Sequence, residues 1–169
     1  MDRSHLIDQL ARHEEVYRAF FKDLTPHEKT WKPATDKWCI QEILCHLYDE
    51  EREDFHRRLE HVLSTPEAPL PPSNPTEWMA TRNYMARDFN TELQRFLDER
   101  RHTVAWLRTL RNAAWNNVHQ HPKVGPITPD LFLTNWVAHD LHHLRQLINL
   151  RHAYLKSIST VPLDYAGTW

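Results

Sequence analysis

Glycine is scarce in this chain, where only Gly125 and Gly167 occur among 169 residues. Average usage near 7% would supply roughly a dozen glycines in a chain of this length. Tight β-hairpin turns depend on glycine because their central residues adopt positive φ angles. The shortage therefore argues against multi-stranded sheets and favours a helical protein.

Cysteine is equally scarce, and the two present, Cys39 and Cys45, lie within one segment of helical periodicity. At this spacing their side chains point to different faces of a helix, so they cannot form a disulfide. The chain also lacks an apolar signal-peptide core and any apolar run of about 20 residues. Free thiols and these absences predict a cytoplasmic protein without a transmembrane helix.

No charge of one sign dominates the composition. Lys and Arg number 21 against 23 Asp and Glu, which gives a formal net charge of −2. Surfaces that bind nucleic acid or anionic membranes depend on an excess of clustered cations. The composition therefore predicts neither nucleic acid nor membrane as a partner.

The 11 prolines are clustered, at residues 26–33, 66–75, 122–129 and 162. Proline is excluded from helix interiors because it lacks the backbone N–H and clashes with the preceding turn. Four proline-free segments of helical periodicity remain, at 3–24, 39–64, 76–113 and 130–158. We therefore predict an all-α fold, a single four-helix bundle over residues 1–169. The Pro-rich segment 64–75 is the predicted crossover between the second and third helices.

Each segment carries apolar residues at three- and four-residue steps, which is typical of a helix with one buried face. In the third segment these residues are Met85, Phe89, Leu93, Phe96, Val104, Leu107 and Leu110, with one longer gap. In the second they are Ile40, Leu44, Leu47, Tyr48, Phe55, Leu59 and Val62. In the first they are Leu6, Leu10 and either Phe20 or Phe21.

Histidine is abundant, with 13 in the chain. His139 and His143 are four residues apart, a spacing that lets two imidazoles on one helical face reach one ion. About one such pair arises by chance at this abundance, so the spacing alone is a weak signal. Both lie at the border of an apolar face, where an imidazole needs a metal or a hydrogen bond as partner. That face is predicted to contain Val137, Leu141, Leu144 and Ile148. His142 is a possible substitute ligand, or a residue that contacts the ligands without binding the ion.

A third histidine, His46, lies among carboxylates in the second segment. Glu42, Glu50 and Glu53 share its helical stripe, and Asp49 is one turn further on. An acidic stripe beside an imidazole suits a cation, and Asp49 or Glu50 is the candidate catalytic proton acceptor. The alternative is that the run 49–54 is an ordinary solvated, charge-rich helical face.

Two segments carry a resemblance to a known family. Residues 37–51, KWCIQEILCHLYDEE, and residues 139–147, HDLHHLRQL, resemble the second-helix and last-helix signatures of the DinB-like family of metal-binding four-helix bundles. The resemblance extends over nearly the whole chain in the order and spacing of its segments. One departure is Cys39, where related sequences commonly have Ser or Thr as the helix N-cap. Because a thiol caps poorly, the helix start is open to a shift.

The resemblance implies a metal site formed by His46, His139 and His143. It also implies a DinB-like bundle and a homodimer. The ion would be one divalent transition metal, with zinc or nickel first and iron or manganese as alternatives. Three protein ligands leave a coordination position open to water or substrate, as in catalytic sites.

Two functions remain open from the sequence. The first is a metal-dependent enzyme acting on a small-molecule substrate, either a low-molecular-weight thiol-dependent transferase or a hydrolase. The second is a non-catalytic module, either a stress-associated metal or ligand binder or a dimerising interaction module, in which the histidines are structural. Exposed Trp and Leu side chains on an outer face would favour the second.

Overall fold

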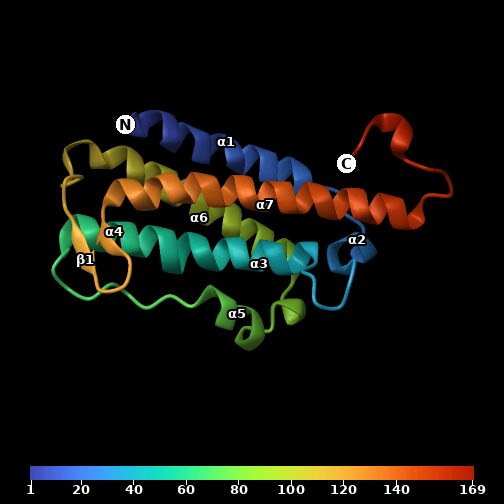
Figure 1. Cartoon of the computed structure of the whole chain (residues 1–169), viewed down its shortest axis with the longest axis horizontal. Helices are drawn as coiled ribbons and strands as arrows, with labels where there is room; N and C mark the ends of the chain where they lie inside the picture. Colours follow the sequence, from blue (N-terminus) through green and yellow to red (C-terminus); the bar gives the residue numbers. More distant parts are fainter.

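Four principal helices form the computed structural model, which describes residues 1–169 (Figure 1). They are α1 (Arg3–Phe21), the continuous run of α3 (Ile40–Glu50), the π-helical η1 (Glu51–His56) and α4 (Arg57–Ser64), then α6 (Phe89–Thr109) and α7 (Pro129–Ile158). The connections hold α2 (Pro26–Thr30), α5 (Pro75–Thr81), η2 (Tyr84–Ala86), η3 (Leu110–Asn112), β1 (His119–His121) and β2 (Gly125–Ile127), and η4 (Asp164–Ala166) follows α7. The predicted all-α four-helix bundle is confirmed. No helix is both long and apolar enough to cross a bilayer.

The helices do not simply alternate in direction (Figure 1). Residues 65–74 run back beneath the bundle after α4, so that α6 points in the same direction as α3 and α4. α6 packs between α1 and α3, while α7 contacts α1, α3 and α4. This arrangement places the middle of α3 beside the middle of α7.

The helix ends follow ordinary capping chemistry. The Asp88 side chain accepts a hydrogen bond of 2.8 Å from the Thr91 N–H at the start of α6. Thr128 and Pro129 begin α7 as N-cap and first helical residue. The poor thiol cap does not shift α3, which begins directly after Cys39. The Glu42 carboxylate caps this end of the helix by accepting a hydrogen bond of 2.8 Å from the Cys39 N–H.

Two expectations need correction. The third helix begins at Phe89 and not near residue 76, because Asn83 adopts a left-handed conformation (φ 46°) and Asp88 starts a new helix. Met85 consequently lies in η2 and is 42% exposed, outside the core. The chain also contains one two-stranded hairpin, β1–β2. It is compatible with the glycine shortage because Gly125, with φ 79°, supplies a positive-φ residue at its turn.

The apolar core contains two large clusters along the bundle and a third, smaller one of Cys45, Trp78 and Tyr84. One large cluster contains Leu10, Phe55, Val104 and Val137, and the other contains Tyr17, Leu47, Leu97 and Leu147. Buried or partly buried polar residues lie on all four helices, and they include His13 on α1, His46, Glu50 and Glu51 on the second helical run, Arg100 and Thr103 on α6, and His139, Asp140 and His143 on α7. We call this set the polar layer. It contains the candidate functional site.

Candidate metal centre

The three predicted histidines converge within the polar layer. Nε2 of His139 lies 3.3 Å from Nε2 of His46 and 3.1 Å from Nε2 of His143. One nitrogen from each ring lies within 4.8 Å of the other two. His46 and His143 are each 5% exposed, and His139 is partly buried. We call His46, His139 and His143 the histidine triad.

The local structure explains why these nitrogens meet. His139 and His143 are one turn apart on α7, and α3 packs against α7 at His46. Nδ1 of His143 lies 2.8 Å from Oε1 of Gln146, an acceptor, so this nitrogen carries the proton. The Nε2 lone pair of His143 is therefore free and points toward the other two rings.

The environment keeps the triad uncharged. Burial, reinforced by the neighbouring imidazoles, lowers the pKa of His46 to about 2. Burial likewise lowers the pKa of His139 to about 3 and that of His143 to about 4. All three rings are neutral at physiological pH, which is the state in which imidazole binds a metal.

The spacing of the nitrogens fits one ion. Two ligands at about 2.0–2.1 Å from a tetrahedral zinc ion are roughly 3.3 Å apart, close to the observed 3.1 and 3.3 Å. Each neutral ring has one donor nitrogen and one acceptor nitrogen. Without an ion, the three Nε2 atoms that point at one another therefore cannot all be hydrogen-bonded to each other. Nδ1 of His46 is also buried without a hydrogen-bond partner. The donor set is thus better satisfied by a cation than by itself.

Aromatic side chains form the wall around the triad. The Trp38 ring lies edge-on to His46 at 5.0 Å between centroids and stacks on His143 at 6.3 Å. The ring centroids of Phe55 and His139 are 5.1 Å apart. These rings limit water on their side of the site, which strengthens electrostatic interactions there.

The two predicted catalytic carboxylates face different surroundings. Asp49 accepts hydrogen bonds from the Tyr84 hydroxyl at 2.9 Å and pairs with Arg82 at 3.0 Å. Glu50 lies one turn beyond His46, is 4% exposed, and has its pKa raised to about 8 by burial and by the Asp54 charge. Neither carboxylate is hydrogen-bonded to the triad. Asp49 is held by Arg82 and Tyr84, whereas burial favours the protonated form of Glu50 at neutral pH.

The acidic run 49–54 is not a solvated face. Asp49, Glu50, Glu51 and Asp54 are all buried, with exposed fractions of 1%, 4%, 1% and 9%. The π-helical turn η1 occupies residues 51–56, and such turns add a residue to the helical repeat. A pattern that assumes a regular α-helix therefore misassigns which carboxylates point inward.

The predicted face of α7 is partly wrong. Leu141 and Ile148 are 52% and 49% exposed, and His142 is exposed as well. His142 contacts Arg145 at 3.4 Å and does not contribute to the converging nitrogens. The inward face instead contains Trp136, Asp140, His143 and Leu147. Of the four apolar residues predicted for the buried face, Val137 is buried and Leu144 packs against the core, whereas Leu141 and Ile148 point to solvent.

A buried ion network beside the triad was missed from the sequence. Arg100 donates to both oxygens of Glu51 at 2.7 and 2.8 Å, and to both of Asp140 at 2.6 and 2.9 Å. The Trp136 indole N–H donates to Glu51 at 2.9 Å, and Nδ1 of His13 lies 2.9 Å from Asp140. The signal was present, because Arg100 occupies the longer gap between Phe96 and Val104 in the apolar stripe of α6.

A similar arrangement of helices occurs in a solved structure, described as "YfiT from Bacillus subtilis is a probable metal-dependent hydrolase with an unusual four-helix bundle topology". The TM-score is 0.77 at 18% sequence identity, and the match covers 89% of this chain and 86% of that chain. No curated protein matches the chain in sequence. A family model described as the DinB superfamily matches residues 9–147, a range that contains the whole triad. The chain therefore belongs to the DinB superfamily.

Proposed function

We propose that this protein is a metal-dependent enzyme that holds one divalent transition metal through His46, His139 and His143. The observation that carries the proposal is the convergence of three neutral imidazole nitrogens, at 3.1 and 3.3 Å, from two helices. Imidazole donors suit zinc and nickel first, with iron or manganese as alternatives. Three protein ligands leave room for a water or a substrate atom, which favours catalysis over a purely structural role.

The residues of the chain suit hydrolysis of a small molecule. A bound divalent ion supplies Lewis acidity and lowers the pKa of a coordinated water toward neutrality. Glu50 is the proposed proton acceptor because it is one turn from His46; since burial raises its pKa to about 8, it accepts a proton only in its ionised form, whose fraction grows as the pH rises toward 8. Asp49 is the weaker candidate because Arg82 and Tyr84 already bind it. Trp38 and Phe55 exclude water beside the triad.

Hydrolysis is the first reaction class to test, since the structurally similar YfiT is described as a probable metal-dependent hydrolase. Thiol-dependent transfer is the second, with a low-molecular-weight thiol as co-substrate. Ester and amide panels assayed with and without such a thiol separate the two. A rate that requires the thiol supports transfer, and a rate independent of it supports hydrolysis.

The deciding measurement is metal content by elemental mass spectrometry on protein purified without an affinity tag or chelator. About one equivalent of a transition metal is expected. The His139→Ala/His143→Ala variant should contain almost none. If the unmodified protein remains metal-free after reconstitution with zinc, nickel, manganese and iron, the proposal is wrong and the histidines are structural.

We also propose that the protein forms a homodimer through α7. Leu141, Ile148 and Leu155 recur at seven-residue steps and are 52%, 49% and 50% exposed, so they form an apolar stripe on one helix. A row of exposed apolar side chains along one helix suits an interface with a second copy of the chain. Light scattering should give twice the monomer mass for the unmodified protein and the monomer mass for Ile148→Glu. Val16→Glu, at an exposed position of α1, is the matched control. A dimer that contains no metal would favour the non-catalytic interaction module.

A further inference from the structure

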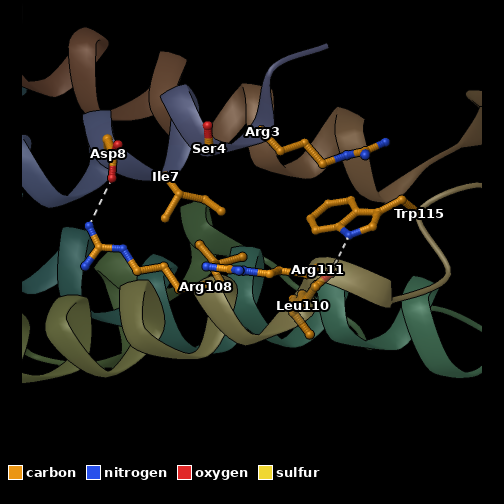
Figure 2. Close-up of a pocket in the computed structure, with 9 residues that line it drawn as sticks. Arg3, Ser4, Ile7, Asp8, Arg108, Leu110, Arg111 and Trp115 are labelled. Atoms are coloured by element: carbon orange, nitrogen blue, oxygen red, sulfur yellow. Dashed lines mark hydrogen bonds and ion pairs between the residues drawn. The ribbon is translucent and has the colours of Figure 1, made fainter.

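A second site lies near the end of the bundle where α1 begins. A cavity of about 390 Å³ opens between the first turns of α1 and the junction of α6 with η3 (Figure 2). This volume falls within the range of small-molecule sites, roughly 300–1,000 Å³. Arg3 at its rim pairs with Asp130 in the first turn of α7. His139 is nine residues further along α7, roughly 14 Å by the helical rise, so the cavity is separate from the triad.

Part of the cavity wall is apolar. Ile7, Leu107, Leu110 and Trp115 line it, and three of them belong to one core cluster while Leu110 packs against that cluster. The indole N–H of Trp115 donates a hydrogen bond of 2.8 Å to the Leu110 carbonyl, which fixes the ring beside the opening. Ile7, Leu107 and Trp115 are already buried, so an apolar body placed against them would remove mainly its own surface from water.

The rim carries one uncompensated positive charge. Arg3 pairs with Asp130 at 2.6 Å, and Arg108 pairs with Asp8 at 3.0 Å. Arg111 also lines the cavity and makes no side-chain hydrogen bond or ion pair within the chain. In Figure 2 the Arg111 and Ile7 side chains extend into the space between the two helices. Three guanidinium groups against two carboxylates leave a net charge of +1 above an apolar wall.

We infer that this cavity binds a small monoanionic amphiphile, an apolar body that bears a single carboxylate. The carboxylate pairs with Arg111, whose planar guanidinium matches it in two parallel hydrogen bonds. The body lies against Ile7, Leu107 and Trp115. A neutral molecule leaves Arg111 unpaired, and a small inorganic anion leaves the apolar wall wet. The site is independent of the proposed metal chemistry and extends the function beyond it.

Calorimetric titration with octanoate tests the inference on the full chain. We expect saturable binding of one octanoate per chain. Arg111→Gln should weaken it at least about tenfold, because a charge-assisted pair is lost. 1-Octanol has the same apolar chain without the charge and should bind at least about tenfold more weakly, for the same reason. Acetate carries the charge without the chain and should give no saturable heat.

Two controls separate this site from other causes. Arg57→Gln removes the same charge from an exposed position on α4 outside the cavity and should bind octanoate unchanged. His143→Ala should also bind octanoate unchanged, which excludes coordination of the carboxylate at the triad. Equal octanoate affinity in Arg111→Gln and the unmodified protein would overturn the inference. So would the absence of saturable binding to the unmodified protein, or loss of binding in His143→Ala.

Discussion

Two buried polar clusters lie side by side in the polar layer, and they differ in how their polar groups find hydrogen-bond partners. In the ion network, Arg100 makes four hydrogen bonds to Glu51 and Asp140, and each carboxylate has a further donor in Trp136 or His13. In the histidine triad, three uncharged rings point their nitrogens at one another, and Nδ1 of His46 has no partner. The first cluster is saturated by the protein itself. The second has lone pairs left for an external cation.

The difference shows how a structural polar cluster is distinguished from a binding site. Burial of a charge is costly unless it is paired and hydrogen-bonded, and Arg100 satisfies that condition entirely within the chain. Burial of neutral imidazoles costs less, and it keeps their lone pairs available by lowering their pKa. Removing a member should therefore damage folding in the first cluster and metal binding in the second.

The largest effect is expected from Arg100→Met. Loss of the guanidinium leaves Glu51 and Asp140 buried without their shared cation, which should lower the free energy of unfolding by about 3–5 kcal/mol. Urea denaturation measures the change. Arg101→Met, at an adjacent exposed ion pair, should cost less than about 1 kcal/mol. Similar losses in the two variants would show that the network adds nothing beyond a surface pair.

His46→Ala should have the next largest effect, and on a different quantity. Loss of one of three ligands should weaken metal binding by more than about 100-fold, beyond the effect of an outer-shell change. At free metal about 100-fold above its Kd, the unmodified protein should gain ~2.7 kcal/mol of unfolding free energy, and the variant almost none. His142→Ala, at an exposed histidine of α7 outside the inward face, should retain the full gain. Retained stabilisation in His46→Ala would remove this residue from the site.

Glu50→Gln should change how stability depends on pH in protein kept metal-free with a chelator. The pKa of Glu50 is raised from 4.5 to about 8, so the folded state favours its protonated form. This contribution is fully present below pH 4.5 and is lost as pH rises toward 8. Glutamine does not ionise, so the variant should be the more stable protein by at least about 2 kcal/mol at pH 9, with little difference at pH 4. Glu60→Gln, at an exposed position, is the control. A gap that does not grow with pH would contradict the buried, protonated Glu50.

The smallest effect is expected from Gln146→Leu. Gln146 accepts from Nδ1 of His143 at 2.8 Å and so holds this ring with Nε2 unprotonated. Loss of such an orienting partner should weaken metal affinity about tenfold without unfolding the protein. Gln146→Glu keeps an acceptor at this place and should bind at least as tightly as the unmodified protein. Unchanged affinity in Gln146→Leu would show that helix packing alone orients His143.

Much of the fold was predictable because local rules govern it. Proline clusters marked the linkers, and apolar periodicity marked residues such as Leu44, Leu59 and Phe96, which are buried as predicted. The failures occurred where a local rule was overridden. Asn83 in a left-handed conformation and the Asp88 cap delay the start of α6, and η1 alters the repeat after Glu50. On α7, exposed Leu141 and Ile148 misled the assignment of the buried face.

The sequence by itself determined the helical class of this protein, and its resemblance to the DinB-like family selected three of the 13 histidines as a possible ligand set. Capping and apolar periodicity depend on residues a few positions apart, and the shortage of glycine is a property of the composition, so all three can be read directly from the sequence. Only the tertiary structure decided that His46 meets His139 across 93 positions, and that Arg100 joins Glu51 to Asp140. These choices depend on which helix faces pack together. Burial then sets the charge state of each polar group, because the energy of a charge depends on its surroundings and not on its place in the sequence.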